Sequence, residues 1–329
     1  MRASSHREPE SQGFDDASWL LVGLCLLFLI LFQLAAPFAF AASGFAGPAA
    51  MIGMLWAASR FYTRYRVRPA FAALITSAML IILFSIAGGI LSYLVAAHGG
   101  ALWDARLERW DRALGFDWLG YARWVNGHPA LATLYRWAYV TMTPQLLVLV
   151  LVLTATNRLR EMRVAICAAI LAGLAAVLLS GLTPAVGNYI HLHLGPGDLP
   201  NLQSAAAATF AQYVDFSGAR DGSLRLIELA KLEGIIVFPS YHSALGAIFI
   251  WGFAQMGRVG WPGMLWASLM LMATPVYGGH YLVDVLAGIS LASAAIAAAG
   301  RLVRRPWLGS IAKIFRGKAS LPVPSTLPA

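Results

Sequence analysis

The chain has 329 residues, of which 59% are hydrophobic and only 12% are charged, and its mean hydropathy is +0.68. A water-soluble domain of this length could not bury so much apolar side chain, so the composition excludes a soluble enzyme and indicates an integral membrane protein. The net charge of +9 would suggest nucleic-acid binding in a soluble protein. In a membrane protein it first indicates which loops face the cytoplasm.

The apolar runs predict an all-α, polytopic bundle of membrane helices. A helix that crosses the bilayer perpendicularly needs roughly 20 residues. Several runs are shorter, so the sequence supports six to eight helices. The expected spans lie at about 18–38, 40–59, 69–97, 130–156, 162–183, 239–256, 260–276 and 279–299. The first span ends in "FAFAAS", which resembles a signal-peptide cleavage site, but its length and the acidic residues before it favour a retained helix.

Charge sorts the loops of these eight spans onto two sides. One side holds both termini and carries two thirds of the 24 Lys and Arg residues but only one third of the 15 Asp and Glu residues. Because Lys and Arg are in excess on cytoplasmic loops, we expect this side, and so both termini, to be cytoplasmic. We interpret the basic tail at 301–318 as a topological signal that touches anionic lipid, with no role in binding nucleic acid.

Two long loops, 98–130 and 184–238, fall on the opposite side. In the first, four apolar residues recur at helical spacing with charged residues between them, which predicts an amphipathic helix in the plane of the membrane interface. These four are Trp103, Leu107, Trp110 and Leu114. The segment "LRLIELAKLEG" at 224–234 predicts a second, shorter amphipathic helix. The expected aromatic belt consists of Trp118, Tyr121 and Trp124.

Three ionisable residues converge at this non-cytoplasmic face. His280 and Asp284 begin the eighth span and are four residues apart, so on a helix they share one face. A carboxylate bonded to one imidazole nitrogen leaves the other nitrogen as a nucleophile or base. His242 lies in the first turn of the sixth span, just after Pro239, and helix N-termini suit a phosphate. This pattern predicts phosphoryl transfer through a phosphohistidine.

Neighbouring residues fit a substrate site. Gly278 and Gly279 would let the backbone approach a ligand, and Ser240 and Tyr241 precede His242 directly. No G-x-S-x-G elbow surrounds Ser240, which speaks against a serine hydrolase. A lone interfacial histidine is more often structural, but ionisable groups at membrane depth are functional candidates.

The motifs "FPSYHSA" (238–244) and "GGHYLVDVLAG" (278–288) resemble those of the type-2 phosphatidic acid phosphatase superfamily, most closely the branch that contains inositol phosphorylceramide synthases. The resemblance extends over about 103–299 and includes the upstream segment 110–144 and "GLTPAVGNY" (181–189). It implies His280 as the nucleophile, Asp284 as the residue that orients it, and His242 as the acid that protonates the leaving group. It also implies a six-helix catalytic core at 69–299, behind two extra helices at 18–68 and flanked by tails at 1–17 and 300–329.

The chain departs from the superfamily's phosphatases in its cations. Those enzymes usually carry a Lys and an Arg-Pro pair in the first motif and an Arg six residues before the nucleophilic His, where this chain has Thr274. Arg68-Pro69 lies in a loop expected on the cytoplasmic side. The headgroup-transferase branch also lacks these arginines, and a phosphodiester carries less charge than a phosphomonoester. The sequence therefore favours transfer from a membrane phospholipid to a lipid alcohol, with two alternatives: a phosphatase that uses water, and a non-catalytic headgroup binder or transporter.

Further candidates have two interpretations each. Arg136 could supply the missing cation or snorkel to the interface. Four tyrosines could line a headgroup site or belong to an aromatic belt: Tyr135, Tyr139, Tyr189 and Tyr281.

A metal or other cofactor is not expected. His191 and His193 have an H-x-H spacing, but no third ligand is evident. Cys25 and Cys167 lie in apolar runs and indicate core filling. The sequence contains no nucleotide-binding loop and gives no indication of the oligomeric state.

Overall fold

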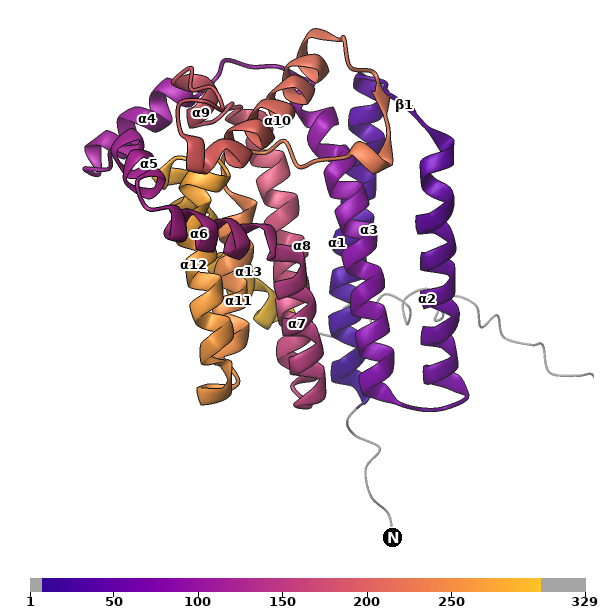
Figure 1. Ribbon diagram of the computed structural model, residues 1–329. Coiled ribbons are helices and arrows are strands. Elements are labelled where there is room, and N and C mark those ends of the chain that lie inside the picture. The colour runs from indigo at the N-terminus through magenta and orange to yellow at the C-terminus, as the bar shows by residue number, and fades with distance from the viewer. Residues whose placement is uncertain (1–7, 303–329) are drawn as a thin grey trace, which may run out of the picture.

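The computed structural model describes residues 8–302, with side chains from residue 16 onward, so most of the expected tails at 1–17 and 300–329 lies outside the described residues. The expected all-α bundle is confirmed (Figure 1). The long helices are α1 (Glu8–Ala35), α2 (Ala46–Arg64), α3 (Pro69–Ala96), α6 (Pro129–Val140), α7 (Met142–Ala155), α8 (Leu159–Leu182), α11 (Tyr241–Ala254), α12 (Trp261–Tyr277) and α13 (Leu282–Leu302). At one end of the bundle lies a head with α4 (Asp104–Ala113), α5 (Trp118–Asn126), α9 (Asn188–His191) and α10 (Gln203–Asp221).

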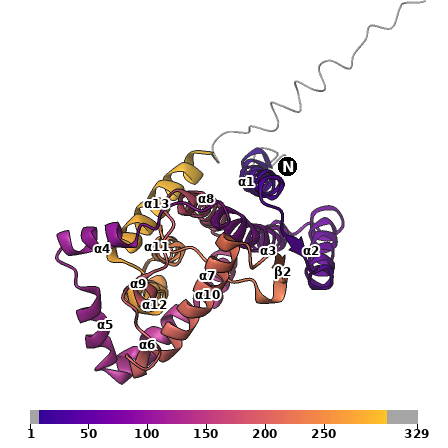
Figure 2. The ribbon, with the colours of Figure 1, turned by 90° about the horizontal axis from the view of Figure 1, so that it is seen from above.

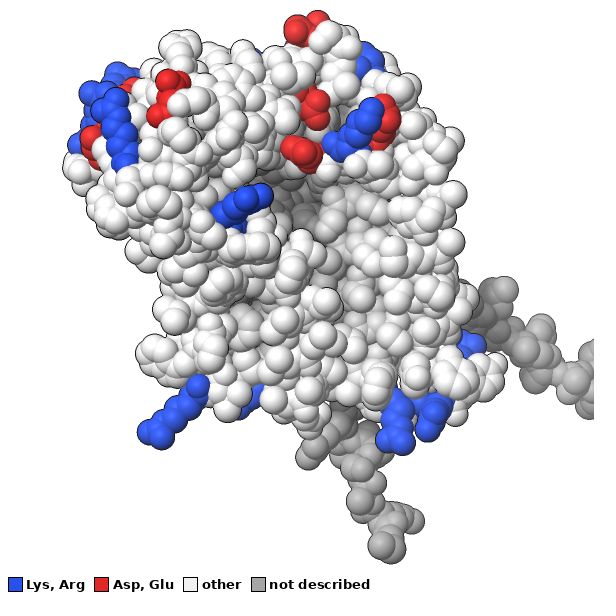
Figure 3. All heavy atoms as spheres, in the orientation of Figure 1, with Lys and Arg blue, Asp and Glu red and all other residues white. Residues whose placement is uncertain are grey.

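Among the described residues, five helices are long and apolar enough to cross a membrane: Asp16–Ala35 of α1, then α3, α8, Gly257–Tyr277 and α13. A sixth span results if the bent pair α6 and α7 counts as one. The chain is therefore a multi-pass membrane protein. In Figure 3 the acidic side chains gather on the head, while basic side chains project from the opposite end of the bundle.

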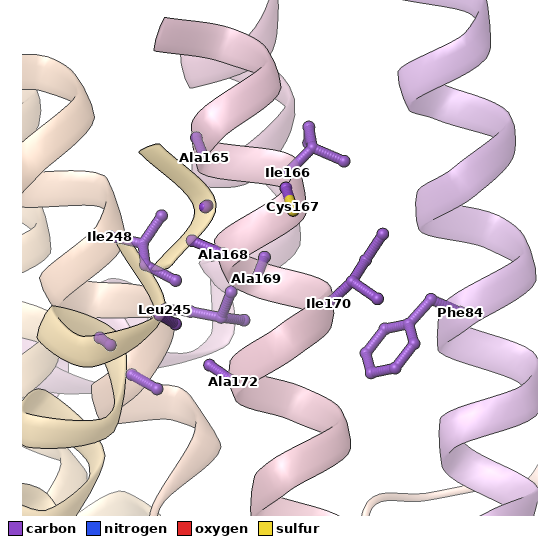
Figure 4. Packing of buried hydrophobic residues seen from close by; sticks show 14 of the residues in the cluster. Phe84, Ala165, Ile166, Cys167, Ala168, Ala169, Ile170, Ala172, Leu245 and Ile248 are labelled. Atoms are coloured by element: carbon purple, nitrogen blue, oxygen red, sulfur yellow. The ribbon is translucent and has the colours of Figure 1, made fainter. Parts of the chain in front are cut away.

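Helix α8 lies at the centre of the bundle, between α3 and the pair α11 and α13 (Figure 2). Its small residues allow close helix packing, which drives association within lipid. Figure 4 shows Ala168 and Ala172 of α8 on the side of Leu245, whereas Ile170 extends toward Phe84 of α3. All five side chains belong to the main buried apolar cluster.

The expected fourth span at 130–156 is not one helix. It breaks at Thr141 into α6 and α7, which are bent by 58° from one another. Polar side chains bond to carbonyl groups at the break: Gln145 Nε2 donates to Ala138 O over 2.9 Å, and the Thr141 hydroxyl donates over 2.6 Å to Trp137 O, which also accepts from Thr141 N–H. The break leaves Tyr139 in the last turn of α6.

The head differs from the sequence-based expectation in three places. The segment 224–234 is not an amphipathic helix: it forms strand β2 (Leu226–Ile227) and a 3₁₀ turn (Leu229–Lys231), because β2 pairs in parallel with β1 (Ala39–Phe40) between α1 and α2. Helix α10 lies within the segment 184–238, for which the sequence predicts a long loop. Trp118 is not an exposed belt residue, since it is buried and its indole donates to Pro275 O over 2.9 Å.

Helix α4 is present where the sequence predicts it, but a different face is buried. Trp110 and Leu114 are exposed, while Asp104, Leu107 and Asp111 face inward. The two carboxylates are inside because each accepts hydrogen bonds from backbone N–H groups: Asp104 from Val186 and Gly187, and Asp111 from the first two residues of α13.

Candidate active site

The candidate site lies at the head end of α11, α12 and α13, which pack side by side (Figure 2). Ser240 is the N-cap of α11: its hydroxyl oxygen accepts from Ser243 N–H over 3.3 Å, which satisfies one of the free donors of the first turn. Ser240 N–H donates to the backbone oxygen of Asp284 over 3.2 Å. This bond joins the start of α11, with His242 as its second residue, to the start of α13.

His280 lies outside the helix in which the sequence places it. Helix α13 begins only at Leu282, and residues 278–281 form a turn in which Gly279 has a φ of +63°, a conformation that glycine adopts without a steric penalty. The late start has a direct cause. The carboxylate of Asp111 accepts from Leu282 N–H over 2.7 Å and from Val283 N–H over 2.9 Å, and so caps the helix from outside.

The contact expected between His280 and Asp284 is made nevertheless. His280 Nδ1 is 3.3 Å from Asp284 Oδ2, and the same oxygen accepts from Tyr281 N–H over 2.9 Å. Both side chains are buried. A neutral imidazole that donates from Nδ1 keeps its lone pair on Nε2, so this contact leaves Nε2 as the nucleophilic atom.

The ring of Tyr139 contacts His242, and its hydroxyl group and His280 Nε2 both lie beside Gly278. The imidazole of His242 stacks on the phenol ring of Tyr139, with ring centroids 4.3 Å apart and planes 9° from parallel. The two histidines are close enough to interact electrostatically. A methyl group at Gly278 would lie 2.9 Å from His280 Nε2 and 2.7 Å from the Tyr139 hydroxyl, so the absence of a side chain there leaves room beside Nε2.

Asp104, on α4, is a further buried carboxylate, although the sequence pattern predicts it only among the charged residues of that amphipathic helix. It accepts from Gly187 N–H over 2.9 Å, from Val186 N–H over 3.1 Å and from the Tyr281 hydroxyl over 3.0 Å. The segment at Gly187 also holds the backbone beside His280, because Asn188 N–H donates to Gly279 O over 2.8 Å. The helical spacing of Asp104, Leu107 and Asp111 was the available signal for this buried face.

Three other residues predicted for the substrate site make contacts within the protein. Tyr135 is buried and accepts from the Tyr121 hydroxyl over 3.3 Å, so it packs between helices and does not line an open site. Tyr241 points to α8, where its hydroxyl donates to Ala169 O over 3.1 Å. Ser240 is buried, and its hydroxyl oxygen accepts from the Ser243 N–H and from the Ser243 hydroxyl, so it caps α11.

The three positions considered for a phosphate-binding cation have different surroundings. Arg136 is exposed on α6, one turn before Tyr139, and interacts electrostatically with Tyr277, whose ring is tilted against Tyr139. The Thr274 hydroxyl donates to Met270 O within its own helix. Arg68 precedes α3 at the end of the bundle opposite the head.

The two histidines of the H-x-H pair lie in different local environments. His191 Nε2 lies 3.1 Å from Glu108 Oε2, whereas His193 follows the end of α9 with a φ of +56°. Within the part of the chain that the structure describes, no group of three or more His, Cys, Asp or Glu side chains could hold a metal ion.

Burial sets the protonation state of the candidate nucleophile. Removal from water lowers the pKa of His280 from 6.5 to about 4, against the opposing effect of a hydrogen bond with the backbone of Val237. His280 is therefore neutral near pH 7, as a nucleophile must be.

A membrane bundle with two histidines at one end, one of them bonded to a buried carboxylate, has the parts for phosphoryl transfer to and from lipids. The chain belongs to the PAP2 superfamily, whose family model matches residues 105–298. Membership makes it an enzyme of the lipid phosphatase or phosphotransferase type. No curated protein and no solved structure matches the chain.

Proposed function

We propose that the protein transfers a phosphoryl or phospho-headgroup group from a membrane phospholipid to a lipid alcohol, as inositol phosphorylceramide synthases do. The observation that carries the proposal is the contact between His280 Nδ1 and Asp284 Oδ2, with His242 stacked on Tyr139 beside it. In this mechanism His280 is the nucleophile, Asp284 orients it, and His242 is the general acid and base.

The reaction proceeds in two displacements. His280 Nε2 forms a bond to phosphorus as the bond from phosphorus to the leaving oxygen breaks, and His242 gives that oxygen a proton. The hydroxyl oxygen of the acceptor then attacks the phosphohistidine, His242 takes the hydroxyl proton, and His280 leaves with its electron pair. Protons and charge balance over the cycle.

Two features support transfer over hydrolysis. His280 is only 4% exposed. A site that excludes water favours reaction with a bound acceptor, and disfavours reaction with water. Thr274 occupies the position at which the superfamily's phosphatases carry an arginine, and its hydroxyl is engaged within α12. A phosphodiester needs fewer cations than a phosphomonoester, and Arg136, on α6 beside the site, is the cation proposed to meet it.

The experiment is rapid-quench trapping with a donor that carries labelled phosphate, on wild type and on His280→Ala. Wild type should form an acid-labile phosphoprotein adduct and, when a lipid alcohol is present, a labelled lipid product. His280→Ala should form neither. Absence of the adduct in wild type, together with turnover by His280→Ala, would overturn the mechanism. Release of free phosphate as the sole product, with a lipid alcohol present, would show a phosphatase.

A further inference from the structure

An apolar groove opens on the lipid-facing side of the bundle just below the head. Its volume is about 340 Å³, which is within the range of about 300–1,000 Å³ for small-molecule sites. Its walls come from α3, α7 and α8, and its roof is the segment 232–236 that follows the 3₁₀ turn. Figure 3 shows the surface hollowed where Figure 1 places α3 beside α8. Because α3 and α8 are both membrane-spanning candidates, the groove opens toward lipid.

Glycines allow the walls of the groove to pack closely. A methyl group at Gly173 would lie 2.6 Å from the ring of Phe84 and 3.0 Å from that of Tyr241, and one at Gly89 would lie 2.7 Å from Leu232 Cδ2. Leu232 of the roof therefore packs directly against helix α3 at Gly89, and the rings of Phe84 and Tyr241 pack against α8 at Gly173.

Two residues that line the groove are close in sequence to the residues of the candidate site. Tyr241 lines it and is the residue before His242. Met142 also lines it, at the first residue of α7, three residues after the Tyr139 that stacks on His242. A lipid whose chain occupied the groove would thus have its polar end beside His242.

The rim of the groove is acidic. Glu233 lines the groove, and an adjoining cavity of about 240 Å³ is lined by Asp215, Glu228 and Lys231. Lys231 Nζ is paired with Glu228 over 2.9 Å, and the Tyr93 hydroxyl donates to Asp215 over 2.6 Å. The unbalanced carboxylates of Glu233 and Asp215 repel a phosphate headgroup but can accept from a hydroxyl group.

We propose that this groove binds the hydrocarbon chain of an uncharged lipid alcohol, the acceptor, and presents its hydroxyl group to His242. The proposal rests on the proposed function, since it names the site of the acceptor in that reaction. The anionic phospholipid donor is expected to reach the site by another route.

The test uses the purified full-length protein in phosphatidylcholine vesicles with two photoreactive probes. These are a diacylglycerol and a phosphatidic acid that carry the same diazirine-bearing chains. After irradiation, peptide mass spectrometry locates the label. The diacylglycerol probe should label groove residues of α3, α7 and α8 about fivefold or more above the phosphatidic acid probe, because only the latter meets like charge at the rim.

Ser85→Trp fills the groove from α3, where Ser85 lines it and is exposed. It should reduce labelling by the diacylglycerol probe about tenfold or more. It should reduce kcat/KM for a long-chain alcohol by a similar factor, because methylene groups that cannot enter the groove stay exposed and contribute no hydrophobic binding energy. Ser290→Trp is the matched control, because Ser290 is an exposed serine on α13 outside the groove. If Ser85→Trp gives little folded protein, Ser85→Leu takes its place.

Equal labelling by the two probes, or full labelling of the groove in Ser85→Trp, would overturn the proposed groove while leaving the phosphohistidine mechanism standing. Labelling as expected in a protein that turns over no phospholipid would refute the proposed function and keep the groove as a lipid-alcohol site.

Discussion

The hydroxyl group of Tyr281 donates a hydrogen bond of 3.0 Å to Asp104 Oδ1, although 177 residues separate the two along the chain. Asp111, two turns further along α4, holds the N–H groups of Leu282 and Val283. The candidate nucleophile His280 therefore lies in a turn fixed on its C-terminal side by two carboxylates from a helix of the head. We interpret Asp104 and Asp111 as positioning residues.

Asp111→Asn should lower kcat about tenfold or more with little change in KM, because one of its two acceptor oxygens becomes an amide that cannot accept, and a hydrogen bond to a charged group contributes about 1.5–3 kcal/mol. Steady-state kinetics on a soluble phosphodiester measures this. Asp117→Asn is the control, since Asp117 is exposed in the same segment and its side chain does not cap α5. A rise in KM with kcat unchanged would contradict a positioning role.

Gly278→Ala should abolish most activity without unfolding the protein. The added methyl group would lie 2.9 Å from His280 Nε2 and 2.7 Å from the Tyr139 hydroxyl, so the imidazole must move from its position. Gly197→Ala is the matched control, because nothing lies within 4 Å of a methyl group there. Thermal unfolding in detergent should show both variants folded, and wild-type rates for Gly278→Ala would count against this placement of Nε2.

His242→Ala should affect donors unequally. General acid assistance contributes about 10²–10⁴ in rate when the leaving group is a poor one. A lipid alkoxide needs that proton, whereas nitrophenolate does not. The loss in kcat should therefore be much smaller for a nitrophenyl phosphodiester than for a phospholipid. An equal loss for both donors would show that His242 has another role.

The pH dependence should reflect the burial of His280. Its pKa is lowered from 6.5 to about 4, so the neutral, nucleophilic form persists below pH 6.5 and is lost only as pH falls through about 4. The acid limb of kcat/KM should accordingly lie well below pH 6.5. Circular dichroism at each pH separates this titration from acid unfolding, and an acid limb at or above pH 6.5 would be inconsistent with the buried imidazole.

The charge distribution predicts the orientation in the membrane. A reporter fused after residue 329 should read as cytoplasmic, and one inserted within 190–230 should read as external, because Lys and Arg are in excess on the side of the termini. The same pair of fusions with opposite signals would place the candidate site on the cytoplasmic face.

The sequence by itself determined the class of protein and indicated three ionisable residues as candidates for the site. Long apolar runs have one stable arrangement, a bundle of membrane helices, because backbone N–H and C=O groups must be paired within lipid. Ionisable residues in such runs are costly, so His242, His280 and Asp284 could be recognised from their positions. The family match over residues 105–298 agrees with the motifs that contain them.

Only the tertiary structure decided how these residues are held. The sequence placed His280 on a helix, whereas Asp111 begins that helix at Leu282 and leaves His280 in the preceding turn. The helical spacing of Asp104, Leu107 and Asp111 places the three on one face of α4. It does not show that this face is buried, since an amphipathic helix with alternating charge is ordinarily solvated on its polar face. The partners of the two carboxylates lie more than 80 residues away, and hydrogen bonds over such separations depend on the packing of the whole head.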